Sequence, residues 1–384
     1  MAYIVDIATA VPEFYIEKES IERFYSQVFG GTHPPSFFQK LRLLNEKTKI
    51  KSRYSCIPDY NGGRFELYEG GNYRQPTEKI MEVYKQKIMP LAAKAINALL
   101  KRNKVKTKDI THLITVSCTG MFAPGFEFLA AEQFDLQHTE KLAINFMGCY
   151  AALKAVKQAN YIAEADPNAC VLIICAELCS LHFYPSDIDE DIISNLLFAD
   201  GAAATLVCGK NNKHIKDKVV LQIDAIGSAC IPNTAELMTW NITSSAFRMY
   251  LSRHIVKAIK ENIKPVLSDF TNGGLTDIDY WAIHPGGVKI VEAVRDKLGL
   301  TENNVADSMH VLKNYGNMSS PTILFILKEI LSKIIMSGEN SDKKIVSCAF
   351  GPGITIEMVG LTSVDTSILA EQITTKYHAI EIEV

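Results

Sequence analysis

The sequence predicts an α/β fold in which two similar halves pack face to face and form layers of helices and sheets. One observation is that apolar runs typical of buried strands alternate with segments of helical periodicity. Another is that the order of these signals repeats: 109–113 is echoed 168 residues later by 277–281, and 145–148 is echoed 169 residues later by 314–317. We therefore predict an N-terminal half over 1–210 and a C-terminal half over 211–384, with a polar linker at 209–218.

The individual elements follow from periodicity. A helical and loop-like pattern covers 17–39, and apolar residues at three- and four-residue steps predict a long helix over 77–102. An apolar run predicts a strand over 112–118. A second run, 141–147, predicts a buried strand that turns at Gly148 into a helix with apolar residues at 151–156. Further strands are expected at 170–177 and after the turn at 198–201, and their counterparts in the second half lie at 344–346 and 350–353.

Composition excludes several classes of protein. The chain has 384 residues, 47% of them hydrophobic, and a net charge of −3, which argues against nucleic acid or an anionic membrane as the main partner. We find no apolar run of the ~20 residues that a membrane span needs and no signal peptide. The nine cysteines form no C-x-x-C pair, so we expect reduced thiols in a cytoplasmic protein rather than disulfides or a zinc site.

Cys149 is the first candidate for chemistry. It follows Gly148 at the predicted start of a helix, where backbone N–H groups and the helix dipole favour an anion. This placement predicts a reactive thiolate with a pKa well below the free value of about 8.5. The alternative is a buried structural cysteine in the core.

The duplication brings two further residues toward Cys149. His284 lies in the turn after a predicted strand of the second half, and Asn317 lies at a helix start equivalent to that of Cys149. A nearby histidine activates a cysteine nucleophile, while a histidine N–H and an asparagine amide can stabilise an enolate or oxyanion. Taken singly, His284 could be a turn residue and Asn317 a helix cap. No metal-binding motif is present in the sequence.

Five motifs together resemble one family. They are Gly148-Cys149, Ile283-His284-Pro285-Gly286-Gly287, 198–204, 315–320 and 349–353. The chain from about 40 to about 361 resembles the type III polyketide synthases, the chalcone synthase-like branch of the thiolase superfamily. It looks like a bacterial-type member rather than a plant enzyme. The resemblance implies a homodimer with a thiolase-like αβαβα fold and an acyltransferase activity that needs no organic cofactor and no metal.

The resemblance also implies a mechanism. Cys149 would take an acyl group from an acyl-CoA starter as a thioester, and His284 would keep the cysteine as thiolate. His284 and Asn317 would then stabilise the enolate formed when malonyl-CoA loses carbon dioxide. Its attack on the thioester would extend the chain by two carbons, and cyclisation would give a pyrone or a phenol.

The same resemblance implies substrate-binding residues. Phe198 corresponds to a gatekeeping phenylalanine between the CoA tunnel and the acyl cavity, and Phe247 to a second one. The wall of the cavity is expected at Cys118, Cys179, His182 and Ser319. In the basic cluster 40–53, Lys40, Arg42 and Lys47 are expected to contact the phosphates of CoA, with Leu43 replacing the arginine of the family.

The cavity residues also give an expectation about the starter. Small side chains at Cys118, Ala123 and Cys179 predict an enlarged cavity and therefore an aliphatic starter, since each buried CH₂ contributes about 0.8 kcal/mol. The alternative is that bulky neighbours, including His182, refill the space and favour a short starter or malonyl-CoA itself.

Two rival functions remain at this stage. One is a β-ketoacyl-carrier-protein synthase III-like enzyme, and the other is a catalytically inactive partner subunit of the same fold. An intact Cys149, His284 and Asn317 argues against an inactive protein. The tail 362–384 contains no motif to which we assign a role.

Overall fold

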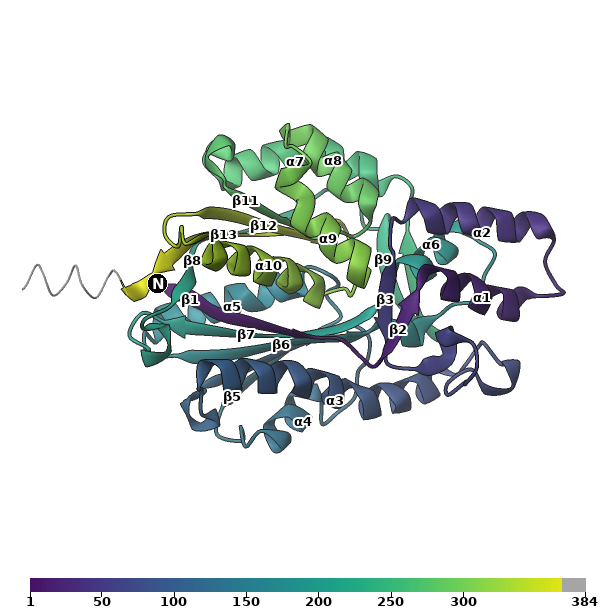
Figure 1. The fold of residues 1–384 in the computed structure, drawn as a ribbon, viewed down its shortest axis with the longest axis horizontal. Helices are drawn as coiled ribbons and strands as arrows, with labels where there is room; N and C mark the ends of the chain where they lie inside the picture. Colours follow the sequence, from purple (N-terminus) through teal and green to yellow (C-terminus); the bar gives the residue numbers. More distant parts are fainter. Residues whose placement is uncertain (368–384) are drawn as a thin grey trace, which may run out of the picture.

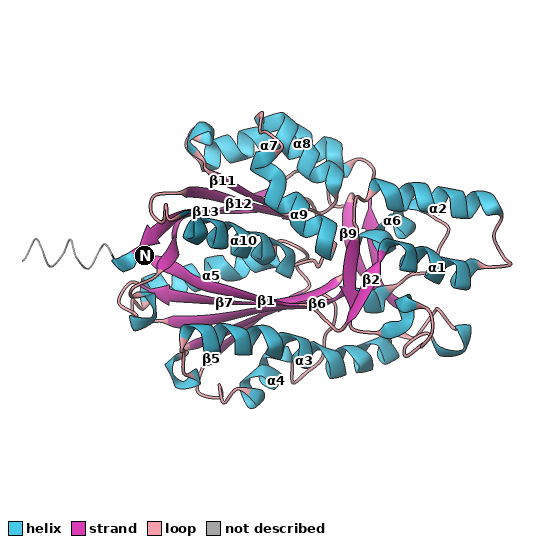
Figure 2. Cartoon of the chain, viewed as in Figure 1, coloured by secondary structure: helices cyan, strands magenta, loops and turns pink. Residues whose placement is uncertain are grey.

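The computed structural model describes residues 1–367, which form a layered α/β fold (Figures 1 and 2). The strands are β1 Ala2–Ala10, β2 Phe14–Glu17, β3 Ser52–Ser55, β4 His112–Ser117, β5 Glu140–Asn145, β6 Cys170–Leu178, β7 Asp200–Gly209, β8 Val219–Cys230, β9 Met238–Thr243, β10 Ala246–Leu251, β11 Tyr280–Ile283, β12 Lys344–Gly351 and β13 Thr355–Asp365. The α-helices are α1 Lys18–Phe29, α2 Pro35–Lys47, α3 Thr77–Asn103, α4 Phe126–Gln133, α5 Ala151–Ala165, α6 Asp189–Leu197, α7 Ile255–Phe270, α8 Val288–Leu298, α9 Ala306–Tyr315 and α10 Pro321–Ser337.

The main sheet has the strand order β11-β12-β13-β8-β1-β7-β6-β4-β5. Strands from the two predicted halves meet at β8 and β1, where only Tyr3–Gln222 and Ile4–Leu221 are paired. Figure 1 shows the sheet folded over at this junction, with α5 and α10 between its two arms. Helices α3 and α4 cover one outer face, and α7 and α8 cover the other. The expected layers of helix and sheet are therefore present, while the division at residue 210 stays a prediction.

Helices α5 and α10 lie between the two arms of the sheet. They follow the motifs 145–148 and 314–317, which the sequence duplication relates to each other. Helix α5 buries nine of its 15 residues, and α10 is apolar around most of its circumference. A helix that is apolar on every side is stable only when it is packed on every side. The position between two sheets supplies such packing, and it brings the starts of α5 and α10 into the same interior.

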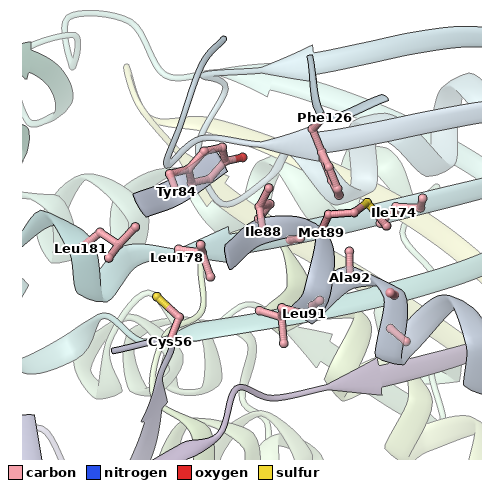
Figure 3. Close-up of a cluster of buried hydrophobic side chains, with 14 of the residues drawn as sticks. Cys56, Tyr84, Ile88, Met89, Leu91, Ala92, Phe126, Ile174, Leu178 and Leu181 are labelled. Atoms are coloured by element: carbon pink, nitrogen blue, oxygen red, sulfur yellow. The ribbon is translucent and has the colours of Figure 1, made fainter. Parts of the chain in front are cut away.

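Helix α3 confirms the prediction made for 77–102. Its side chains at three- and four-residue steps are buried, among them Tyr84, Ile88 and Leu91. In Figure 3 these side chains lie against Ile174 and Leu178 of β6. The amphipathic pattern thus marks the face that packs on the sheet.

The prediction of a buried strand at 141–147 is wrong. Strand β5 ends at Asn145 and pairs with β4 alone, so it forms an edge of the main sheet. Most of its side chains are exposed, including Leu142. An apolar run cannot by itself distinguish a central strand from an edge strand that carries apolar residues.

A buried ionic cluster joins α5 to the second half. Glu357 of β13 is fully buried and accepts hydrogen bonds from Lys154 (2.6 Å), Lys157 (2.7 Å) and Ser228 (2.6 Å). Burial alone would raise the pKa of Glu357, but these hydrogen bonds lower it below its usual value. The carboxylate therefore fixes the helix that follows Cys149 against β13 and β8.

Replacing Glu357 with glutamine is expected to destabilise the protein by about 3–5 kcal/mol at pH 7, because Lys154 and Lys157 lose the charge that compensates them. The lowered pKa means that this stabilisation is complete above the ordinary carboxylate pKa and is lost as the pH falls through the folded-state value. Urea unfolding at pH 7 and at progressively lower pH measures both effects. Glu261→Gln, in an exposed pair with Lys257, is the control and is expected to change little.

Candidate active site

Cys149 lies in the turn between β5 and α5, two residues before the helix begins. Gly148 has a φ of +80°, and a Cβ there would collide with Pro352 of the second half. Glycine is therefore required for the turn to pass so close to the other half. The N–H of Gly148 donates to Sγ of Cys118 at 3.0 Å, which fixes the backbone just before Cys149.

The second half supplies His284 and Asn317. His284 follows β11, and its N–H donates to the carbonyl of Cys348 at 2.9 Å. Asn317 follows α9, and its backbone forms a bridge with Phe198 of the first half. Its Oδ1 accepts a hydrogen bond from the N–H of Ser319 at 2.9 Å, which leaves Nδ2 as a donor toward Cys149.

Cys149, His284 and Asn317 line one cavity of about 300 Å³, called here the outer cavity. All three are buried, with exposed fractions of 7%, 0% and 1%. Neither ring nitrogen of His284 has a hydrogen-bond partner among residues 1–367. A fully buried imidazole with two unpartnered nitrogens on the wall of a cavity is a site for a polar ligand or a mobile proton.

The expected thiolate–imidazolium pair is absent from this structure. Burial raises the pKa of Cys149 to about 12, although hydrogen bonds to Ser319 and Asn317 oppose the shift. Burial also lowers the pKa of His284 to about 3. The prediction of a low pKa for Cys149 is wrong, because desolvation in a site closed by both halves outweighs the favourable helix start. Both shifts favour a thiol and a neutral imidazole over the charged pair.

A second, smaller cavity of about 40 Å³ lies beyond Phe198 and is called here the inner cavity. Phe198 and Met249 line both cavities, so they form the partition between them. Phe247, Cys179 and His182 line the inner cavity. Cys118 and Ser319 line neither cavity; Cys118 holds the turn at Gly148, and Ser319 contacts Cys149.

The inner cavity is small, about 40 Å³, rather than enlarged. His182 stacks on Phe247 with ring centroids 4.5 Å apart, and Trp240 packs edge-on against both rings. Nε2 of His182 lies 2.7 Å from the carbonyl of Thr119, and its Nδ1 accepts from the N–H of Phe247 at 3.0 Å. These contacts fix the aromatic cluster, whose three rings line the inner cavity together with Cys179.

Comparison with known proteins identifies the family. Residues 1–211 match the model of the N-terminal domain of chalcone and stilbene synthases, and residues 222–365 match the model of their C-terminal domain. The chain belongs to the chalcone and stilbene synthase family. It is a type III polyketide synthase with a thiolase-like fold, an acyltransferase that condenses malonyl-CoA onto an acyl starter.

A solved structure agrees with this assignment. The synthase is similar to PKS-I from the brown alga Ectocarpus siliculosus, with 27% sequence identity and a TM-score of 0.87. The match covers 94% of this chain and 98% of the algal chain. The similarity therefore extends over both halves and includes the elements that carry Cys149, His284 and Asn317.

The basic residues expected at the CoA site separate in the synthase. Lys47 lines the outer cavity, whereas Lys40 pairs with Asp189 at 2.6 Å and Arg42 is exposed outside it. Sequence reasoning missed Arg253 and Lys289, which line the same cavity. The position of Lys289 in the first turn of α8, directly after Gly286-Gly287, was the available signal, because helix starts favour anions.

Glu177 was also missed. Its carboxylate is fully buried and accepts hydrogen bonds from the Cys118 N–H (2.8 Å), Thr119 (2.8 Å) and Ser320 (2.7 Å). Burial raises its pKa, and its charge contributes to the raised pKa of Cys149. The available signal was a glutamate at the end of an otherwise apolar strand.

No helix of the described residues is long and apolar enough to cross a membrane. Within residues 1–367, histidine, cysteine, aspartate and glutamate side chains form no group of three or more that could hold a metal ion.

Proposed function

We propose that the synthase loads a short acyl group onto Cys149 and extends it with malonyl-CoA, using His284 and Asn317 as the groups that handle protons and negative charge. The observation that carries this proposal is the outer cavity, whose wall holds all three side chains together with three cations. The partition at Phe198 and Met249 then separates the CoA side from the acyl side.

Loading starts from neutral partners. As Sγ of Cys149 attacks the carbonyl carbon of the acyl-CoA, its proton passes to His284, whose ring nitrogens are unpartnered. The tetrahedral intermediate then breaks its bond to the sulfur of CoA, and the departing thiolate takes the proton from His284. The acyl group stays on Cys149 as a thioester, and His284 returns to its neutral form.

Extension uses Asn317 and His284 together as hydrogen-bond donors. Nδ2 of Asn317 and an N–H of His284 donate to the thioester oxygen of malonyl-CoA as carbon dioxide leaves and negative charge develops on that oxygen. The enolate carbon attacks the acyl thioester, a carbon–carbon bond forms, and Cys149 leaves and regains a proton from solvent. The Ser319 N–H holds Asn317 with its amide nitrogen toward Cys149, which supports this role.

The phosphates of CoA are assigned to the mouth of the outer cavity. Lys47, Arg253 and Lys289 line it, and Lys260 continues the positive surface along α7, where Lys257 pairs with Glu261. Phosphate groups favour clustered cations and helix starts. Lys40 and Arg42 lie outside this cavity and receive no role in the proposal.

The starter is proposed to be short. An inner cavity of about 40 Å³ has room for roughly three water molecules, far less than an alkyl chain requires. The aromatic cluster of His182, Trp240 and Phe247 closes it, so the alternative of a refilled cavity replaces the aliphatic starter.

A panel of acyl-CoA starters tests the proposal. With malonyl-CoA as extender, kcat/KM is expected to fall steadily as a linear starter lengthens from acetyl to decanoyl. His182→Ala should restore turnover of the longer starters, because the stacked ring on Phe247 is removed. Equal kcat/KM along the series would contradict the short-starter proposal, and no condensation with any starter would contradict the function itself. His310→Ala, at a surface histidine, is the control.

A homodimer and a cytoplasmic location complete the proposal. The free edge of β5 is flanked by exposed apolar side chains on and around α4, β5 and α5, namely Met121, Phe128, Leu142 and Tyr161. Such a surface suits a second copy of the chain pairing along β5. All nine cysteines are free thiols in the structure, which suits a reducing compartment.

A further inference from the structure

The inner cavity contains a buried positive charge without a carboxylate partner. Arg53, on β3, is 5% exposed and lines this cavity. Its Nη1 donates to the carbonyls of Asn195 (3.0 Å) and Phe198 (3.1 Å), at the end of α6. Among residues 1–367, its Nε and Nη2 have no hydrogen-bond partner, although an arginine carries five N–H donors.

The other charges around the cavity cancel. Asp191, the acidic residue among the described lining residues, forms a bidentate pair with Arg248 at 2.9 and 2.8 Å. His182 is uncharged, because burial lowers its pKa to about 4. Burial lowers the pKa of Arg53 only to about 10, so it keeps its charge at neutral pH. The lining therefore has a net charge of about +1, due to Arg53.

An unpaired buried charge is costly, so it indicates a ligand of opposite charge. The planar guanidinium group matches a carboxylate in particular, because two parallel N–H donors bind its two oxygens. The size of the cavity agrees with this chemistry, since about 40 Å³ admits a small polar group and excludes a long alkyl chain. Phe198 lines both this cavity and the outer cavity that holds Cys149, and Arg53 donates to the carbonyl of Phe198.

We infer that the inner cavity of the synthase binds a carboxylate at the far end of the acyl group carried by Cys149, and that Arg53 is the residue that recognises it. The preferred starters are then CoA thioesters of short dicarboxylic acids. This inference rests on the proposed function, because it requires an acyl group on Cys149. It adds a substrate class and a specificity-determining residue to that function.

The test measures the rate at which Cys149 is acylated, by intact mass spectrometry of the full chain without malonyl-CoA. Succinyl-CoA is compared with 4-methylpentanoyl-CoA, in which a branched methyl pair replaces the carboxylate at nearly the same shape. The wild-type protein is expected to load succinyl faster by about 10- to 100-fold, the range typical of hydrogen bonds to a charged group. Arg53→Gln should remove this preference by slowing succinyl loading while leaving 4-methylpentanoyl loading unchanged.

Arg74→Gln is the matched control, because Arg74 also donates to a backbone carbonyl but is exposed and lies outside the cavity lining. It should leave both rates unchanged. Equal loss of both rates in Arg53→Gln would assign Arg53 a purely structural role at the end of α6 and overturn the inference. If Arg53→Gln does not fold, Arg53→Lys serves instead and is expected to keep the preference for succinyl.

Comparing the two thioesters in wild-type protein also tests the inference without a variant. Equal loading of succinyl and 4-methylpentanoyl overturns the inference. If free succinate also raises the Tm in that case, the cavity is a site for a free anion rather than for the acyl group. Failure of both thioesters to acylate Cys149 would contradict the proposed function itself, so the two failures are distinguishable.

Discussion

Asn317→Ala is expected to slow decarboxylation of malonyl-CoA by ~10²–10³-fold, the usual effect of removing one oxyanion donor. Acylation of Cys149 should continue, because the proton of the thiol passes to His284 rather than to Asn317. The backbone bridge of Asn317 with Phe198 does not involve its side chain, so the partition between the cavities should keep its position. Release of acetyl-CoA from malonyl-CoA measures the first step, and intact mass after exposure to an acyl-CoA measures the second.

Asn314→Ala is the control for this variant. Asn314 lies near the end of α9 and is half-buried, with its amide bonded to the carbonyl of His310 at 2.9 Å. It should leave both steps unchanged. A comparable loss of acylation and decarboxylation in Asn317→Ala would contradict the separate roles assigned to His284 and Asn317.

Alkylation of Cys149 by iodoacetamide is expected to be slow at neutral pH and to rise about tenfold per pH unit up to at least pH 10. The reason is that alkylation needs the thiolate, and burial raises the pKa of this thiol to about 12. At pH 7 the thiolate fraction of Cys149 is then far below that of a free cysteine. A thiolate–imidazolium pair would instead give a fast rate that is constant from about pH 6 to 9.

The exposed thiol of Cys230 provides the internal comparison for this experiment. In Cys230→Ser the signal of Cys149 is isolated, and in Cys149→Ala the signal of Cys230 is isolated. A plateau below pH 7 for Cys149 in the first variant would show that a charged pair exists in the resting enzyme. Base catalysis by His284 during loading would then be unnecessary.

The sequence was informative where function depends on turns between strands and helices. Cys149, His284 and Asn317 each sit at such a turn, and the duplicated order of elements was enough to predict that they converge. Helix α3 was predictable because one face of it is buried along its whole length. These features depend on local sequence patterns that occur in a fixed order, so they can be recognised without knowing the surrounding structure.

Features that depend on distant neighbours were not predictable. The pKa of Cys149 depends on how fully two halves exclude water from it, and the exposure of β5 depends on its place at the edge of the sheet. Trp240 lies in the β9–β10 hairpin, which carries no motif, yet it helps to fill the inner cavity. Lys40 belongs to a basic cluster in sequence, but Asp189 on another helix neutralises it.

The central claim is that Cys149 carries the acyl chain, and intact mass spectrometry of wild-type protein and Cys149→Ala after exposure to an acyl-CoA tests it most directly. The wild-type protein should gain the mass of one acyl group, located on the peptide that contains Cys149. Cys149→Ala should gain none and form no extended product, while it still decarboxylates malonyl-CoA through His284 and Asn317. Acylation at another residue, or chain extension by Cys149→Ala at near wild-type rate, would contradict the account.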